Sequence, residues 1–445
     1  MEKAELTLDA AHVRDAISQY MLADGLKIVF DLERSRGSRI YDALTGSSYL
    51  DFFGCFATIP LGYGHPRLTS PEVLLELGQA AVQKPSNSDI YSVEMGRFVS
   101  TFARVAKPHF MKYLFFIEGG ALAVENALKA AFDWKVRQNF AKGYATEKGH
   151  RVIHFKQAFH GRSGYTLSLT NTADPRKTMY FPKFADWPRV LNPKCTFPLE
   201  GENLDRTIAD EEEALRQIRR AIAEDPDSIA CIILEPIQGE GGDNHFRPEF
   251  HQALRRTCDE NDLLLIYDEV QTGFGATGRM WACEHFVEPD IIAFGKKSQI
   301  CGIMAGGRLD LVPDNVFHVS SRINSTWGGN LVDMVRSRLY LEIFEEERIV
   351  ERSRELGERL LEWLRELQAE FPEIVSNARG RGLFCAVDLP SRAFRDEFLS
   401  RLFQKRLIML GCGERSIRVR TALNIPEDDL NEGVQTIRIT LRELT

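Results

Sequence analysis

The chain has 445 residues, of which 44% are hydrophobic and 27% are charged, values typical of a soluble globular protein. A formal net charge of −8 argues against a nucleic-acid-binding protein, because there is no excess of lysine and arginine to neutralise phosphates. No apolar run approaches the ~20 residues that a membrane-spanning helix needs, so no membrane partner is expected.

The eight cysteines are scattered along the chain, and none belongs to a C-x-x-C pair. This usage indicates reduced thiols in a cytoplasmic protein rather than a disulfide framework, and it predicts no metal site. The first ten residues are acidic and polar, so no secretory signal peptide is expected.

Predicted elements in the first half of the chain are a helix within residues 1–30, a hairpin over 38–53 and a helix over 73–82. Strands and helices then alternate. Strands are expected at 114–117, 152–155, 229–234, 263–267 and 291–294, with helices at 121–135, 211–223 and 248–261. This alternation predicts an α/β fold with a mostly parallel sheet and helices on both of its faces.

The C-terminal part predicts a long helical region over 331–370, then a glycine-rich strand near 380–387 and an α+β tail. A chain of this length should form two domains. We expect residues 1–60 to contribute to a small domain, residues 61–335 to form the large domain, and residues 336–445 to complete the small one.

Charged residues follow two of the predicted buried strands. Strand 263–267 runs into Asp268-Glu269, and strand 291–294 is followed by Gly295 and then Lys296-Lys297. Open α/β sheets bind ligands at the carboxyl ends of their strands. A lysine there can form a Schiff base with pyridoxal phosphate, while an aspartate pairs with the pyridine nitrogen and maintains the ring as an electron sink. Taken alone, the same charges could instead form a salt bridge that caps the strands.

Three other segments carry candidate binding groups, each with a structural alternative. Gly119-Gly120-Ala121 lies between a strand and a helix, where backbone N–H groups can bind a phosphate or simply form a tight turn. In Phe159-His160-Gly161-Arg162, the aromatic ring could stack on a cofactor and the arginine could bind a carboxylate. Alternatively, Phe159 could be a core residue and Arg162 a surface residue. Glu240 lies in a glycine-rich loop and could be a solvated acid.

Residues 273–278 match G-x-G-x-x-G, the fingerprint of a dinucleotide-binding fold. The match begins five residues after Asp268 rather than directly at a strand end, and it lies deep in the chain. A nicotinamide-dependent oxidoreductase is therefore the weaker alternative.

Taken together and in this order, these motifs resemble the class III pyridoxal-phosphate-dependent aminotransferases, from about Leu50 through Leu423. The resemblance implies a fold-type I transferase whose small domain is built from both termini, and a homodimer with shared active sites. Asp268 would meet the pyridine nitrogen. Thr326, in the segment Asn324-Ser325-Thr326, would contact the phosphate of the second subunit.

The resemblance also implies a choice between the two lysines. In the family's common pattern, three residues separate the Schiff-base lysine from a glycine pair or its equivalent. Lys297 precedes Cys301-Gly302 by that spacing, whereas Lys296 lies one position too early, so Lys297 is the predicted catalytic lysine. Gly119 stands where a hydroxyl residue is usual, so phosphate binding would depend on the backbone amides of Gly120 and Ala121.

Within that family the segments 84–92, 159–165 and 324–330 are most similar to the lysine 6-aminotransferases. These enzymes move the ε-amino group of L-lysine to 2-oxoglutarate by a ping-pong mechanism, giving 2-aminoadipate 6-semialdehyde and glutamate, in a step of lysine catabolism. Carried over by position, Phe159 would stack on the cofactor, and Arg162 would bind the substrate α-carboxylate. Gln271 would lie beside the pyridine oxygen and the bound acid.

Glu240 would pair with Arg418, with Arg420 as the competing choice. That ion pair, formed for lysine and opened for 2-oxoglutarate, would let one site accept both substrates, and glycines around Glu240 would ease its movement. The alternatives within the family are enzymes that act on ornithine, 4-aminobutyrate or a diamine. A pyridoxal-phosphate-binding regulator without turnover would normally bring a DNA-binding module, and the sequence shows none.

Overall fold

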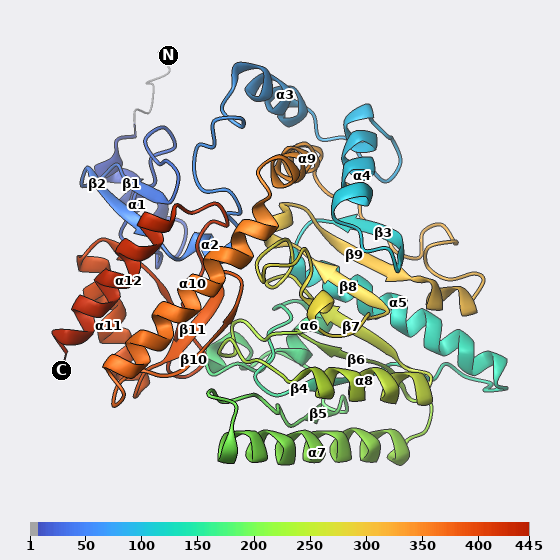
Figure 1. Cartoon of the computed structure of the whole chain (residues 1–445). Coiled ribbons are helices and arrows are strands. Elements are labelled where there is room, and N and C mark those ends of the chain that lie inside the picture. Colours follow the sequence, from blue (N-terminus) through green and yellow to red (C-terminus); the bar gives the residue numbers. More distant parts are fainter. Residues whose placement is uncertain (1–7, 445) are drawn as a thin grey trace.

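The computed structural model describes residues 8–444, and its largest element is a seven-stranded sheet (Figure 1). In order across the sheet, the strands are β3 (Met111–Ile117), β9 (Cys301–Gly306), β8 (Ile291–Phe294), β7 (Leu264–Asp268), β6 (Ile229–Leu234), β4 (Arg151–Phe155) and β5 (Arg189–Val190). Neighbours from β8 to β5 are parallel, whereas β9 is antiparallel to both of its neighbours. The predicted mostly parallel sheet is thereby confirmed.

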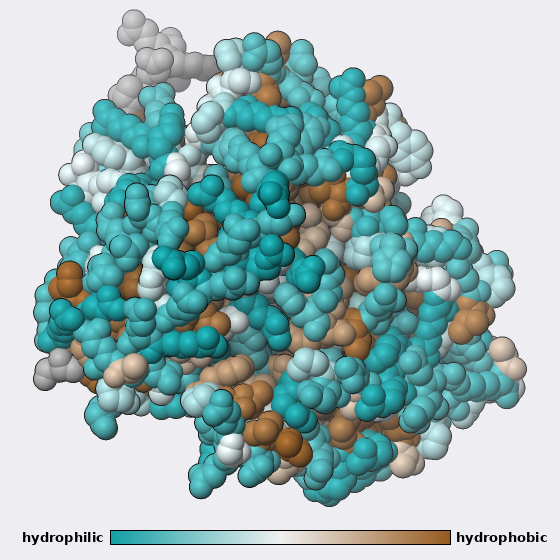
Figure 2. Space-filling model, in the orientation of Figure 1, coloured by the Kyte–Doolittle hydropathy of each residue, from teal (hydrophilic) through white to brown (hydrophobic). Residues whose placement is uncertain are grey.

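Successive residues of each central strand pack on opposite faces of the sheet, because side chains alternate along a strand. Leu264 and Ile266 of β7 belong to the cluster under α5 (Gly120–Ala141), while Leu265 and Tyr267 belong to the cluster that contains α8 (Pro248–Glu260). Both faces are therefore apolar, as parallel sheets require. Hydrophilic residues cover most of the molecular face drawn in Figure 2, and hydrophobic ones show there in small patches.

Two smaller sheets hold the chain ends together (Figure 1). The four-stranded antiparallel sheet has the order β10 (Ser376–Arg381), β11 (Phe384–Asp388), β14 (Ser416–Val419) and β13 (Leu410–Cys412). In the three-stranded sheet, the predicted hairpin β1 (Arg39–Asp42) and β2 (Ser47–Asp51) is joined by β12 (Leu407–Ile408), which runs parallel to β2. An α+β region built from both termini is thus present, while the exact domain boundaries stay a prediction.

The remaining helices of three or more turns are α3 (Pro71–Val82), α4 (Val93–Val105), α7 (Gly201–Glu224), α9 (Leu331–Glu346), α10 (Ile349–Glu370), α11 (Arg392–Gln404) and α12 (Glu427–Arg442). The long helical region predicted over 331–370 consists of two helices, because Arg348 adopts φ +52° between α9 and α10. Helix α7 begins at Gly201 rather than at Glu211, and α4 and β9 were not predicted.

The N-terminal helix expected within residues 1–30 is shorter than that span. A 3-10 turn (Ala10–His12) leads into α1 (Val13–Ser18), and residues 1–7 lie outside the described residues. No helix in the described part of the chain combines the length and apolarity needed to cross a bilayer.

Candidate active site

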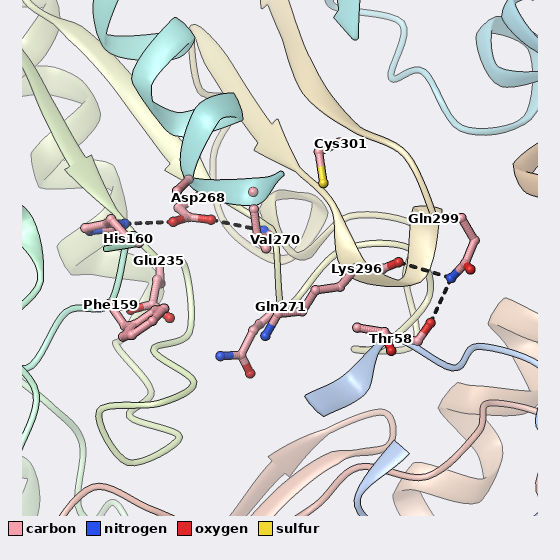
Figure 3. A pocket seen from close by; sticks show the side chains of 13 residues that line it. Thr58, Phe159, His160, Glu235, Asp268, Val270, Gln271, Lys296, Gln299 and Cys301 are labelled. Atoms are coloured by element: carbon pink, nitrogen blue, oxygen red, sulfur yellow. Dashed lines mark hydrogen bonds and ion pairs between the residues drawn. The ribbon is translucent and has the colours of Figure 1, made fainter. Parts of the chain in front are cut away.

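A cavity of about 490 Å³ opens at the carboxyl ends of the central parallel strands, beside the N-terminus of α5 (Figure 3). The predicted cofactor-binding residues Gly120, Ala121, Phe159, Asp268 and Gln271 all line it. They come from three separate parts of the chain, and the sheet brings them together because parallel strands present their carboxyl ends at one edge.

Asp268 ends β7 and is 4% exposed. Its Oδ2 lies 2.8 Å from Nδ1 of His160, and its Oδ1 accepts a hydrogen bond from the N–H of Val270 at 3.1 Å (Figure 3). Two partners on opposite oxygens fix the direction of the carboxylate at the cavity wall. Sequence reasoning noted His160 only as part of a motif and missed this role as a neighbour of Asp268.

The lysine on the cavity is Lys296, not the predicted Lys297. Lys296 follows β8 and lines the same cavity as Asp268, and Figure 3 shows its side chain directed toward Gln271. Burial lowers the pKa of Lys296 to about 7, and the nearby Arg418 and Arg420 act in the same direction. An amine with such a pKa is substantially uncharged at neutral pH, as nucleophilic catalysis requires.

Lys297 is not among the residues that line the cavity. It is 2% exposed, and its Nζ donates a hydrogen bond to the backbone carbonyl of Ala57 at 3.1 Å. Burial lowers the pKa of Lys297 well below its usual value. Its amine is engaged with the backbone and does not line the cavity, so the structure places Lys296 there instead, and which of the two lysines forms the Schiff base stays a prediction.

The segment that Lys297 contacts is a left-handed turn. Residues Gly54, Cys55, Phe56 and Ala57 all have φ between 49° and 67°, a conformation that costs energy for non-glycine residues. Gln299 Nε2 donates to the carbonyl of Thr58 at 2.8 Å, next to this turn (Figure 3). Lys297 and Gln299 therefore attach the turn, and with it Thr58, to the cavity wall.

The N-terminus of α5 faces the cavity through Gly120 and Ala121. Gly119, with φ +95°, precedes the helix, and among the described residues no side chain caps its first amides. Free amides at the positive end of a 22-residue helix favour an anionic group. The side chain of Val270 packs on Gly120, since a Cβ added there would lie 3.1 Å from Val270 Cγ1.

Glu235 is a buried acid of this site that sequence reasoning did not single out. It is 3% exposed, and its oxygens accept the backbone N–H groups of Phe159 and Gly239, each at 2.9 Å. Burial raises the pKa of Glu235 to about 7, and the charge of Asp268 raises it further. Its position after β6, in Glu235-Pro236, was the available signal. Glu235 fixes the backbone that carries the Phe159 ring.

The predicted Glu240–Arg418 ion pair is not formed. Glu240 pairs instead with Lys177, and its second oxygen, Oε2, is buried without a hydrogen-bond partner among the described residues. Arg418 is 5% exposed, and its Nη1 lies 3.5 Å from Gln271 Oε1. Arg420, the competing choice, pairs with Asp243 at 2.5 Å and stacks on Phe384. Arg418 is thus the arginine of the two that has no carboxylate partner among residues 8–444.

Arg162 and Thr326, two further predicted residues, are also absent from the cavity lining. Arg162 follows the lining residue Gly161 but is exposed. Thr326 is also exposed, and its carbonyl accepts a hydrogen bond from the Ser86 hydroxyl at 2.5 Å. Since the predicted contact of Thr326 is with the site of a second subunit, its role stays a prediction.

The G-x-G-x-x-G segment does not form a dinucleotide site. No α-helix follows residues 273–278; a turn leads instead to a 3-10 helix at Ala282–His285. Gly278 packs against Arg354, and a Cβ on Gly275 would lie 3.0 Å from Leu423. These glycines permit close packing on the C-terminal region, so the alternative of a nicotinamide-binding fold is contradicted.

Comparisons with known proteins show the family of this chain. A family model for aminotransferase class-III matches residues 20–441. The L-lysine-epsilon aminotransferase of Mycobacterium tuberculosis is 53% identical over 97% of this chain and 96% of the relative, and that of Streptomyces clavuligerus is 49% identical over 97% and 94%. The solved structure of the M. tuberculosis lysine aminotransferase in its internal aldimine form has a TM-score of 0.96 at 52% identity, covering 98% of this chain and all of the other.

Proposed function

Because this chain belongs to the class III aminotransferases, we propose that it moves the ε-amino group of L-lysine to 2-oxoglutarate. The products are 2-aminoadipate 6-semialdehyde and glutamate, made in two half-reactions. The observation that carries the proposal is Lys296 with its lowered pKa on the same cavity wall as Asp268. The choice of lysine as amino donor rests on the near-full-length similarity to two L-lysine-epsilon aminotransferases.

The residues of the cavity fit pyridoxal phosphate, the cofactor of this family. When bound, it supplies an aldehyde that links to amines and a ring that withdraws electrons from the adjacent carbon. Lys296 would hold the aldehyde and Asp268 the ring nitrogen. The amides of Gly120 and Ala121 would hold the phosphate, with Phe159 and Val270 as apolar walls. An acid, an amine, an uncapped helix end and two apolar surfaces in one cavity match each part of the cofactor.

Proton transfer falls to Lys296. Its free Nζ would remove a proton from the ε-carbon of lysine in the first half-reaction and would deliver a proton to the former keto carbon of 2-oxoglutarate in the second. A pKa of about 7 suits both directions, because the amine can accept and release a proton near neutral pH. Asp268 remains paired with His160 throughout and stabilises positive charge next to it.

Carboxylate recognition falls to two arginines. Arg162 binds the distal carboxylate of either substrate, and Arg418 binds the carboxylate adjacent to the keto carbon of 2-oxoglutarate. Lysine brings no carboxylate to that near position, so Arg418 must be masked while lysine reacts. Glu240 is the carboxylate that masks it, and in the described state Glu240 is paired elsewhere. This state is therefore the one suited to the keto acid.

We place the enzyme in the cytoplasm as a homodimer, in which Thr326 of each subunit contacts the cofactor phosphate of the other. The exposed position of Thr326 is compatible with such a contact. The absence of a helix long and apolar enough to span a membrane, within residues 8–444, fits small-molecule substrates in solution.

Single-turnover absorbance of the purified holoenzyme tests the proposed donor. Excess L-lysine alone should convert the visible cofactor band, and 2-oxoglutarate should restore it. L-ornithine and 4-aminobutyrate, mixed separately with the holoenzyme, serve as the comparison. Conversion by either of these at least as fast as by lysine would contradict the assignment of the donor.

A further inference from the structure

Lys177 is a cation that neither the cofactor nor the two substrates need, yet it holds the acid on which the dual specificity depends. We propose that Lys177 competes with Arg418 for the Glu240 carboxylate, and thereby keeps Arg418 available to the keto acid. This inference rests on the proposed function and adds to it a residue that sets the balance between the two substrates.

The position of Lys177 is fixed by its own turn. It ends the 3-10 helix Pro175–Lys177, which Asp174 caps by accepting the N–H of Arg176. Asp174 also pairs with the Arg176 side chain at 2.9 Å. Lys177 Nζ lies 5.8 Å from the centre of the Phe159 ring, at the edge of the cavity. Its side chain is 17% exposed, so its charge is only partly screened by water.

The loop that carries Glu240 cannot move as the glycines in its sequence suggested. The N–H groups of Gly242 and Asp243 both donate to the carbonyl of Gly239, and Gln238 pairs with Asn244. A Cβ on Gly241 would lie 2.0 Å from the carbonyl oxygen of Gln157, so the backbone is tightly packed. Any change of partner must therefore come from rotation of the Glu240 side chain alone.

Arg418 is the group that a rotated Glu240 side chain would pair with. Arg418 is buried and has no ion-pair partner among the described residues, and its Nε lacks a hydrogen bond there. A Cβ on Gly239, which precedes Glu240, would lie 2.5 Å from Gln271 Oε1, the same atom that Arg418 approaches at 3.5 Å. Gly239, the neighbour of Glu240 in the chain, and Arg418 thus border one amide group. A buried unpaired guanidinium attracts any carboxylate within reach, whether from substrate or from Glu240.

Two arrangements follow from these contacts. With Glu240 on Lys177, Arg418 is free for the carboxylate of 2-oxoglutarate. With Glu240 on Arg418, the near position is neutral and accepts the apolar chain of lysine. Lys177 stabilises the first arrangement by one half-buried ion pair, so its removal shifts the equilibrium toward the second.

The test compares Lys177→Met, which retains length but loses charge, with Lys177→Arg and with Lys183→Met as a matched control. Lys183 is an exposed lysine of the same segment whose Nζ donates to the Phe181 carbonyl. In single-turnover half-reactions, Lys177→Met should raise the concentration of 2-oxoglutarate needed for half-maximal rate by about fivefold to thirtyfold, with the lysine half-reaction unchanged or faster. Lys177→Arg and Lys183→Met should behave as wild type.

Glutarate binding gives a readout that does not depend on the amino donor. The holoenzyme variant Lys177→Met should bind this unreactive dicarboxylate more weakly than wild type by a similar factor. In a Glu240→Gln background, the same substitution should change glutarate binding by less than about twofold, because the neutral amide no longer masks Arg418. Failure of wild type to react with lysine would refute the proposed donor, while the glutarate comparison would still decide the role of Lys177.

Three results would overturn the inference. Equal slowing of both half-reactions would make Lys177 a structural residue. Selective weakening of lysine binding would make it a direct contact to the donor carboxylate. An effect of Lys177→Met that persists undiminished in the Glu240→Gln background would show that Lys177 does not act through Glu240.

Discussion

Substitution of Lys297 by methionine separates the two adjacent lysines by their contacts. Methionine retains the apolar length of the side chain and removes the amine that donates to Ala57. Since burial favours the neutral amine of Lys297, the substitution removes one hydrogen bond rather than a charge pair. Loss of that bond and of the partner for a buried carbonyl lowers the free energy of unfolding by about 1–3 kcal/mol. The turn Gly54–Ala57 would loosen, and turnover should remain within about tenfold of wild type.

The assay pairs turnover with chemical mapping. The holoenzyme is reduced with borohydride, digested, and the modified peptide is identified by mass spectrometry. Wild type and Lys297→Met should both carry the label at Lys296, and Lys296→Met should lose both the label and essentially all turnover. Labelling at Lys297, or a folded Lys297→Met protein without turnover, would refute the assignment made from the cavity.

Three further predictions use the same site. Asp268→Asn removes the anionic partner of His160 and of the cofactor ring in a dry environment, so turnover should fall on the order of 10²-fold or more while cofactor remains bound; near-normal turnover would contradict its role. In the apoprotein, Lys296 should react with acetic anhydride with a midpoint near pH 7, its rate rising with pH as the amine loses its proton, and a midpoint near that of surface lysines would contradict the lowered pKa. Folding raises the pKa of Glu235 from 4.5 to about 7, so this group contributes stability that is fully present below pH ~4.5 and is lost as pH rises through 7. Glu235→Gln should therefore reduce the change in the free energy of unfolding between pH 5 and pH 8 by about 3 kcal/mol. Denaturant titration at a series of pH values measures this change.

The central sheet could be predicted because its signals are local. Leu264–Asp268 and Ile291–Phe294 are short apolar runs ended by charges, and each becomes a buried strand with its charge at the cavity. Strand β9 was not predicted, because Cys301–Gly306 contains two glycines and has no alternation of polar and apolar residues.

The choice between the lysines depended on backbone conformation, which the sequence does not display. Lys296 adopts φ +56°, an uncommon value for a residue other than glycine, and this turn directs the two successive side chains to different places. A spacing rule does not report this conformation, so the identity of the Schiff-base lysine stays a prediction. The positive φ values of Cys55 and Phe56 could not be predicted either, because neither residue type favours the left-handed conformation.

Contacts between distant parts of the chain were also not predictable from the sequence. Arg418 was identified by its motif, but its neighbour Gln271 lies 147 positions away in the sequence and Lys177 comes from an irregular segment. Lys177 and Arg418 are alternative ion-pair partners of Glu240. Only the three-dimensional arrangement shows that Glu240 pairs with Lys177.

Transfer of isotope from labelled lysine to glutamate tests the proposed ε-transamination. Holoenzyme is incubated with 2-oxoglutarate and L-lysine that carries ¹⁵N either at the ε-amino or at the α-amino position, and the glutamate formed is analysed by mass spectrometry. We expect label in glutamate from ε-labelled lysine and none from α-labelled lysine. Label from the α position, or no labelled glutamate from either substrate, would contradict lysine ε-transamination by this protein.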